Sequence, residues 1–434
     1  MNHQTFIWGR SGNRIRKTER WVEGLSVFGL LLAALLLFGI NLDSLPLQDW
    51  CEAKIELIAH KLVQESVDYW QWLYPQNLSE PPLGTWLIAS AYELGGINNS
   101  MARLPSAILT ALSVPLLYGI GREVFHCRQS AVFSSLIYLT LIPVVYHGRL
   151  ALADGSCLCF TILMMWCVLR SRRDFRWALG IGAGLSLICL TKGMGMGLLL
   201  GVIALLFLRW DTPRLLISVY WWLGLLLGIF PGVAWYIGFL LINVDNFNIL
   251  GMFNQFIQPF WLPWLSDSRP TLYYLVEMLA VPWLLFLPSW LSCAWEHRNW
   301  SWAKFVLVWA VFYLVGIAVM ISQKSWYFLP IYPALALAGG YQLATIWNGS
   351  SCKIYPRFWS LGLSLLAIGF VASSLGFKLQ EIQQQTYQAL PIFCASIALT
   401  MTIAAVLVAR RNLQFIMILL WGTYISLLLL MMSM

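Results

Sequence analysis

The sequence predicts an all-α membrane protein, a polytopic transmembrane helical bundle. Two observations carry this prediction. Of the 434 residues, 59% are hydrophobic and only 11% are charged, which leaves too little polar surface to cover a soluble domain. Continuous apolar runs of about 20 residues also recur to the end of the chain, and such runs are typical of helices that cross a membrane.

The first apolar run, near residues 24–42, is predicted to be a membrane helix. It is too long for the core of a signal peptide, and no small-residue cleavage pattern follows it. Basic residues beside a span mark the cytoplasmic side. The segment 1–23 is rich in them, so the N-terminus is predicted to be cytoplasmic; they are Arg10, Arg14, Arg16, Lys17 and Arg20.

Later basic clusters predict on which side of the membrane the ends of the other spans lie. Keeping all of them on the cytoplasmic side gives about 13 spans by the usual length rule. The clusters are Arg122 with Arg128, Arg170 to Arg176, Arg209 with Arg214, Arg298 with Lys304, Lys353 with Arg357, and Arg410 with Arg411. The spans lie near 24–42, 103–121, 129–148, 155–170, 177–190, 195–209, 215–242, 273–293, 303–321, 326–346, 358–376, 389–409 and 413–432.

The stretch Pro82–Leu94 is apolar but too short to span comfortably, so it is predicted to lie as an interfacial helix beside the bundle. Two long loops, 43–102 and 243–272, then fall on the extracytoplasmic face. Residues 1–434 are expected to form a single integral-membrane domain with no soluble C-terminal domain.

The cysteines and the net charge indicate no further function. The nine cysteines mostly lie in apolar runs without metal-ligand spacing, so no metal site is predicted from them. The net charge of +8 is explained by topology, and nucleic-acid binding is not expected because no soluble basic domain is present.

The first candidate site is an acidic cluster that follows the first span and contains Asp49, Glu52 and Glu56. If Trp50–Val63 is helical, Glu52 and Glu56 stand one turn apart on the same side. A carboxylate at the mouth of a membrane bundle faces water, a partner or a substrate. The spacing alone also fits a solvated helix face.

The second candidate is the segment His147–Gly155, with Arg149 and Asp154. Asp154 could cap the helix that starts there, because an acidic residue interacts favourably with a helix N-terminus. Arg149 is unusual, because an arginine on the outer side departs from the charge rule and suits a phosphate.

The third candidate comprises two outer-face lysines, Lys192 and Lys324. Each could snorkel to the membrane surface or anchor an anionic lipid head group. Together the three candidates predict a site for a phosphorylated lipid at the outer leaflet. Glycosyl transfer from such a lipid needs a carboxylate base for the acceptor hydroxyl and cations for the departing phosphate.

The order of these motifs resembles that of the integral-membrane GT-C glycosyltransferases of the protein mannosyltransferase and lipid A aminoarabinose transferase group. The resemblance covers roughly Leu42 to Gly340 and is more specific than any one motif. The matching segments are Leu45–Lys61, Ser79–Leu87, Ala102–Pro105, Arg149–Gly155, Thr191–Gly193, and Lys324 with Tyr327, Pro330 and Pro333.

The resemblance implies transfer of a sugar from a polyprenyl-phosphate donor to a lipid, glycan or protein at the extracytoplasmic face. It implies a multi-pass protein of a bacterial-type inner (plasma) membrane, with no nucleotide cofactor. The residues expected to bind the acceptor or act as base are Asp49, Glu52 and Asp154. Those expected to bind substrate are Arg149, Lys192, Lys324, Glu80 and Tyr327, and the first three of them are expected to contact the donor phosphate. A divalent cation could be shared by the three carboxylates, but no ligand spacing demands one.

Three positions depart from the family pattern. Cys51 stands where the family has an aspartate before the glutamate, Glu80 replaces a lysine, and Phe253–Phe260 lacks a histidine and an arginine. Either Asp49 or Glu52 has taken the role of base, or the chain keeps the fold as an inactive or altered relative that binds a lipid-linked sugar or a partner enzyme. A transporter is less favoured, because its polar residues should lie near mid-membrane.

Overall fold

In a computed structural model, the described part of the chain comprises residues 12–43, 50–64, 81–242, 282–319, 325–349, 358–384 and 389–433. These ranges are helical and contain no strand, which confirms the predicted all-α class. The α-helices are α1 (Gly12–Gly39), α2 (Trp50–Gln64), α4 (Leu83–Gly95), α5 (Asn99–Val124), α6 (Arg128–Leu139), α7 (Ile142–Arg149), α8 (Asp154–Arg170), α9 (Ala178–Lys192), α10 (Met194–Asp211), α11 (Val219–Ile242), α14 (Leu287–Glu296), α15 (Ser301–Val319), α16 (Tyr332–Asn348), α17 (Phe358–Gln384), α18 (Ala389–Ala409) and α19 (Phe415–Ser433). Short 3-10 helices are η1 (Phe175–Trp177), η2 (Pro213–Ile217), η4 (Trp283–Phe286) and η5 (Ser325–Ile331).

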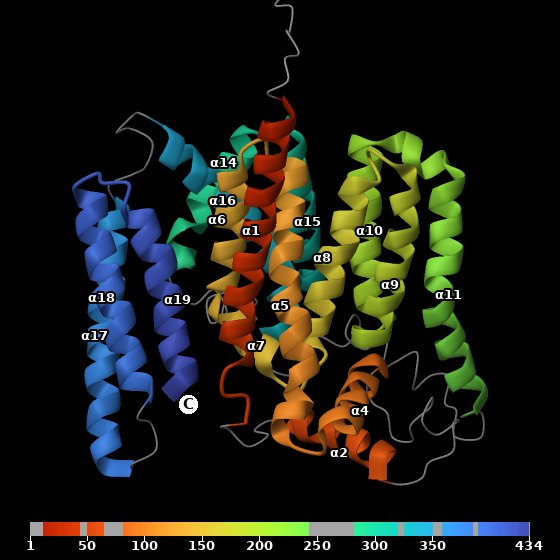
Figure 1. Ribbon diagram of the computed structural model, residues 1–434, viewed down its shortest axis with the longest axis horizontal. Helices are drawn as coiled ribbons and strands as arrows, with labels where there is room; N and C mark the ends of the chain where they lie inside the picture. Colours follow the sequence, from red (N-terminus) through yellow and green to blue (C-terminus); the bar gives the residue numbers. More distant parts are fainter. Residues whose placement is uncertain are drawn as a thin grey trace, which may run out of the picture.

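The long helices run side by side and form a bundle (Figure 1). α1, α5 and α8 lie in its middle, α9 to α11 form one flank, and α17 to α19 form the other. Two shorter helices, α2 and α4, lie across the lower end of the bundle, where α4 packs against α5 and α2 packs against α4. The two ends of the bundle therefore differ, because α1 begins at the end opposite to α2 and α4.

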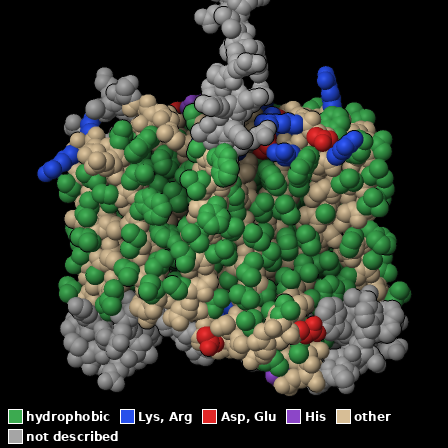
Figure 2. Space-filling model, viewed as in Figure 1, with side chains coloured by type: hydrophobic (Ala, Val, Ile, Leu, Met, Phe, Trp, Pro, Cys, Tyr) green, Lys and Arg blue, Asp and Glu red, His purple; other side chains and the backbone are tan. Residues whose placement is uncertain are grey.

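The sides of the bundle are suited to a membrane. Figure 2 shows hydrophobic side chains over the sides, with Lys and Arg gathered at the end where α1 begins. Among the described helices, eight are long and apolar enough to cross a membrane, or nine if the pair α6 and α7, bent by 60°, counts as one span. The chain is thus a multi-pass membrane protein. The predicted number of about 13 spans is not confirmed by this criterion, although each predicted span contains a helix over its described residues.

α9 and α11 pack backbone against backbone. A Cβ atom on Gly182 would lie 1.8 Å from the carbonyl oxygen of Gly224, and one on Gly228 would lie 2.2 Å from the carbonyl carbon of Gly182. The Ser186 hydroxyl also accepts a hydrogen bond of 2.9 Å from the Gly232 N–H. Small residues permit such close approach between membrane helices. This contact fixes the position of α11 on the flank of the bundle.

The end of the bundle beneath α5 has its own small core. Apolar side chains of α2 and α4 meet there, with Ile55 and Ala59 on α2 and Ile88 on α4. The Tyr92 hydroxyl donates a hydrogen bond of 3.1 Å to Glu56 Oε1, and burial together with the Glu56 charge raises the pKa of Tyr92. The predicted helix after the first span is therefore α2, and the predicted interfacial helix is α4.

Candidate active site

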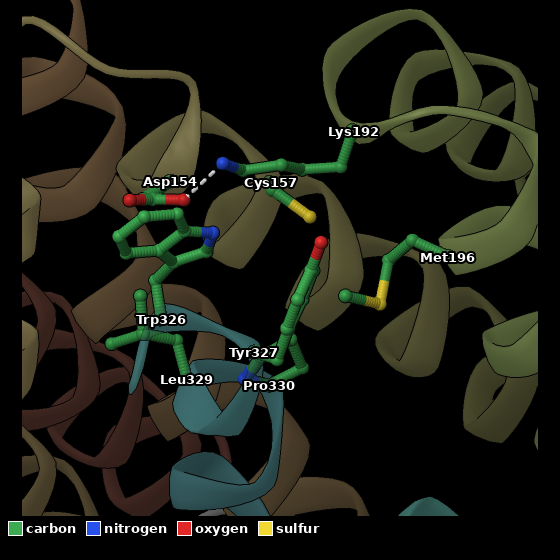
Figure 3. Close-up of a pocket in the computed structure, with 8 residues that line it drawn as sticks. All are labelled: Asp154, Cys157, Lys192, Met196, Trp326, Tyr327, Leu329 and Pro330. Carbon is green, nitrogen blue, oxygen red and sulfur yellow. Dashed lines mark ion pairs between the residues drawn. The ribbon is translucent and has the colours of Figure 1, made fainter. Parts of the chain in front are cut away.

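The candidate site is built around an ion pair between Asp154 and Lys192 (Figure 3). Asp154 is the first residue of α8 and is 2% exposed, while Lys192 is the last residue of α9. The chain turns at Gly193, whose φ of +94° is readily adopted by glycine, and α10 begins directly after it. A buried carboxylate needs a partner of opposite charge. Two residues predicted from separate motifs are thus brought together.

His147 lies at the other oxygen of Asp154. Its Nδ1 is 3.4 Å from Asp154 Oδ2, and its side chain is 7% exposed. His147 is in the last turn of α7, and residues 150–153 connect that helix to α8. The Trp326 ring meets the imidazole edge to face, at 6.4 Å between centroids. Asp154 is therefore held between a lysine and a histidine.

A small pocket opens beside this ion pair, between α8, α10 and η5. Figure 3 shows the Tyr327 hydroxyl pointing toward Cys157 and Lys192. The Tyr327 carbonyl accepts a hydrogen bond of 2.6 Å from the buried Tyr313 hydroxyl, which fixes η5 in place. Tyr327, predicted to bind substrate, therefore shares the pocket with two other predicted residues; the lining is Asp154, Cys157, Lys192, Met196, Trp326, Tyr327, Leu329 and Pro330.

An apolar groove of about 370 Å³ lies between α9, α10 and α11. Its lining is apolar apart from Ser186, and Gly197 and Gly201 on α10 leave room for it. The lining reaches Met194, two residues beyond Lys192, so the groove begins next to the ion pair. A hydrocarbon chain fits such a surface through van der Waals packing against its apolar lining.

Glu52 occupies a fully buried position between α2 and α5. It accepts hydrogen bonds from Arg103 Nε at 2.9 Å, from Arg103 Nη2 at 3.1 Å and from the Ala151 N–H at 2.8 Å. Arg103 Nη1 also donates to the Leu42 carbonyl at 3.0 Å. Both carboxylate oxygens of Glu52 are thus hydrogen-bonded, and they join α2, α5 and the loop that precedes Asp154. The role of Glu52 as a base stays a prediction.

Arg149 lies at the C-terminal end of α1. Its Nη1 donates to the Leu37 carbonyl at 2.8 Å, and its Nη2 donates to the carbonyls of Ile40 at 2.7 Å and Asn41 at 3.2 Å. Carbonyls in the last turn of a helix have no partner within the helix, and a cation nearby also interacts favourably with the helix dipole. The structure therefore shows Arg149 bonded to the end of α1, and its contact with a phosphate stays a prediction.

The remaining predicted residues lie outside the described ranges. These are Asp49, Glu80, Lys324 and the segment Phe253–Phe260, and their assignments stay predictions. The backbone of Cys51 belongs to the first turn of α2. Within the described ranges, no three His, Cys, Asp or Glu side chains are arranged to hold a metal ion.

Sequence reasoning did not single out His147 or Trp326. His147 belongs to the same segment as Arg149 and Asp154, and its place seven residues before Asp154 was the available signal. Its contact depends on the path of residues 150–153 between α7 and α8, which no spacing rule predicts. Trp326 directly precedes Tyr327, but a tryptophan near a membrane surface is common, so its position carried little information.

Known proteins share both sequence and fold with this chain. The sequence model of the dolichyl-phosphate-mannose-protein mannosyltransferase family matches residues 79–237. An undecaprenyl phosphate-alpha-4-amino-4-deoxy-L-arabinose arabinosyl transferase of Pseudomonas fluorescens is 26% identical over 64% of this chain and 53% of its own length. A relative of the same name from Aeromonas hydrophila is 26% identical over 82% of this chain and 66% of its own length. The chain thus spans about half to two thirds of the curated relatives it matches.

Two solved structures have the same fold. The crystal structure of ArnT from Cupriavidus metallidurans bound to undecaprenyl phosphate superposes with a TM-score of 0.73, at 19% identity, over 94% of this chain and 76% of that one. The apo structure of the same protein gives a TM-score of 0.68, at 20% identity, over 96% and 77% of the two chains. The chain is thus similar in sequence to these membrane glycosyltransferases and shares the fold of ArnT.

Proposed function

We propose that the protein transfers a sugar from a polyprenyl-phosphate donor to a hydroxyl of a lipid, glycan or protein acceptor. The observation that carries this proposal is the buried Asp154–Lys192 pair, which lies in the lining of a small pocket and two residues from the lining of an apolar groove. A polyprenyl-phosphate sugar has matching parts, because it joins an anionic head to a hydrocarbon chain. The names of the relatives and the ligand of the ArnT crystal structure support the same class of donor.

In this proposal Lys192 binds the phosphate of the donor. An ammonium group stabilises the negative charge that develops on a departing phosphate. The polyprenyl chain lies in the α9–α11 groove, which starts two residues beyond Lys192 at Met194. The sugar then lies in the pocket, near Tyr327 and Trp326.

Asp154 is the base in this reaction. The acceptor oxygen attacks the anomeric carbon, a new carbon–oxygen bond forms, and the bond from that carbon to the phosphate oxygen breaks. The leaving polyprenyl phosphate keeps the electron pair, and the acceptor proton moves to the Asp154 carboxylate. The ion pair with Lys192 weakens Asp154 as a base, and a donor phosphate that draws Lys192 away restores its basicity.

The site is proposed to face the extracytoplasmic side of a bacterial-type inner membrane. Arg170, Arg172 and Arg173 lie at the far end of α8 from Asp154. By the charge rule that far end is cytoplasmic. The end with Asp154, α2 and α4 is then the outer end, where a lipid-linked sugar and its acceptor meet.

Sugar transfer in reconstituted membranes tests this function. The full-length protein in vesicles would be given radiolabelled polyprenyl-phosphate sugars, with bacterial lipid and glycan extracts as acceptors. We expect label to move to an acceptor, and we expect Asp154→Asn to reduce transfer by at least about a hundredfold, the usual contribution of a general base. Asp174→Asn is the matched control, because Asp174 is an exposed cap of η1 in a loop on the opposite side. Equal transfer by both variants would refute the assignment of Asp154.

A second candidate is a catalytically inactive relative that binds a lipid-linked sugar or a partner enzyme. It is favoured by Cys51 and Glu80 at motif positions and by the buried, fully bonded state of Glu52. The double variant Cys51→Asp with Glu80→Lys separates the two. Transfer by the variant from a silent wild type supports the inactive relative, whereas transfer by the wild type excludes it.

A further inference from the structure

His147 is a buried, titratable side chain to which the proposed reaction gives no role. Its Nδ1 lies 3.4 Å from Asp154 Oδ2, whereas Lys192 pairs with Asp154 Oδ1. The carboxylate is therefore contacted on each of its two oxygens by a different residue. If one contact is withdrawn, the other still holds the carboxylate.

The position of His147 is fixed from several sides. A Cβ atom on the neighbouring Gly148 would lie 2.6 Å from Thr110 Cγ2 and 2.9 Å from Phe38, so α7 packs tightly here. Arg149, the next residue, is bonded to the carbonyls at the end of α1. The imidazole is thus attached to a rigid segment, while Lys192 has a long side chain that can move.

We propose that His147 is a positioning residue that holds Asp154 in place when an anionic lipid phosphate draws Lys192 out of its ion pair. This proposal rests on the proposed function, because it takes Lys192 as the phosphate contact. It adds a residue that neither the motifs nor the comparisons assign.

The physical argument is a competition for one ammonium group. Asp154 and the donor phosphate are both anionic and both pair with Lys192. A buried carboxylate that loses its only polar partner is strongly disfavoured. His147 supplies a second partner, so Asp154 can release Lys192 and remain in position to accept a proton. Without His147, Asp154 retains Lys192 more strongly and the phosphate binds less tightly.

A double-mutant cycle on lipid binding tests this coupling without any need for turnover. The probe is undecaprenyl phosphate, titrated into the full-length protein in nanodiscs. We expect His147→Leu to raise Kd about fivefold or more, the lower end of typical coupling between sites. In an Asp154→Asn background the same change should alter Kd by less than about twofold, because the competing charge is gone. Equal losses in both backgrounds would overturn the proposal.

A conservative variant keeps the test meaningful if His147→Leu fails to fold. In His147→Asn the side-chain amide can take the place of Nδ1 and donate to Asp154, so Kd should stay close to that of the wild type. His126→Leu is the control, because His126 is exposed and far along the chain from the site. A folded His147→Asn protein with a Kd raised as much as that of His147→Leu would contradict the role of Nδ1.

Kinetics separate this inference from the proposed function. If transfer occurs, His147→Leu should lower kcat about tenfold to a hundredfold, the cost of a misplaced catalytic group, and His147→Asn should recover most of it. Binding with the expected coupling but no sugar transfer would leave the inference standing and refute the proposed reaction. A wild type that does not bind undecaprenyl phosphate would refute both.

Discussion

Glu52 and Arg103 form a bidentate ion pair in which neither side chain is more than 7% exposed. They lie 51 residues apart in sequence, on α2 and α5. The Ala151 N–H completes the hydrogen bonding of Glu52, and Ala151 lies three residues before Asp154. The pair therefore connects α2 and α5 to the loop that precedes the candidate base.

Glu52→Gln should destabilise the protein. Removing one partner of a buried ion pair leaves an uncompensated charge, which costs about 3 kcal/mol or more. Unfolding by SDS in mixed micelles, followed by circular dichroism, measures this loss. Glu93→Gln is the matched control, because Glu93 is exposed on α4. If Glu52→Gln abolished transfer while its stability equalled that of Glu93→Gln, Glu52 would have a direct catalytic function after all.

Arg149→Met should lower stability without weakening the binding of undecaprenyl phosphate. Its guanidinium bonds three carbonyls at the end of α1, and hydrogen bonds to a charged group contribute about 2 kcal/mol. Lys192→Met, in contrast, should raise Kd for the lipid phosphate. The two quantities can be measured on the same nanodisc samples. An equal rise in Kd in both variants would mean that Arg149 also contacts the phosphate.

Gly182→Ala should disrupt the contact between α9 and α11. The new Cβ would lie 1.8 Å from the Gly224 carbonyl oxygen, so the helices must move apart. Overpacking of this kind costs about 1–3 kcal/mol. Gly369→Ala is the control, because nothing lies within 4 Å of a Cβ at Gly369 on α17. Thermal unfolding in detergent should show a clear loss for the first variant only; equal midpoints would mean that the helices are not in backbone contact.

Gly201→Leu should obstruct the α9–α11 groove. Gly201 lines it, and its Cβ would lie 3.2 Å from Leu185 Cδ2, so a larger side chain extends into the space for the chain. We expect Kd to rise about tenfold for undecaprenyl phosphate, which is a loss of about 1.4 kcal/mol, and to change little for a ten-carbon prenyl phosphate. Gly376→Leu on α17 is the control, since its Cβ meets open space. An equal rise in Kd for the short and the long lipid would mean that the hydrocarbon chain does not lie in this groove.

Much of the fold followed from the sequence. Apolar runs and basic clusters predicted the all-α bundle, and the short apolar stretch that became α4 was correctly kept out of the spans. Asp154 and Lys192, predicted from two separate motifs, form an ion pair. The local sequence was sufficient for these predictions, because apolar runs, basic clusters and short motifs can each be recognised within one segment of the chain.

The roles of Glu52 and Arg149 could not be read in the same way. The partners of Arg149 are backbone carbonyls more than a hundred residues earlier, at the end of α1. Those of Glu52 are Arg103 and a backbone N–H at Ala151. A charged side chain that bonds to distant backbone has the same sequence signature as one that binds a substrate. Only the three-dimensional arrangement shows these contacts.

In the proposed reaction, Lys192 binds the phosphate of a polyprenyl donor beside Asp154. The most direct test is a cryo-EM structure of the full-length protein in nanodiscs with undecaprenyl phosphate. We predict that the phosphate lies at Lys192 Nζ and the hydrocarbon chain in the α9–α11 groove, with Asp154 still in contact with His147. A phosphate bound elsewhere, with the Asp154–Lys192 pair intact, would refute this role of Lys192.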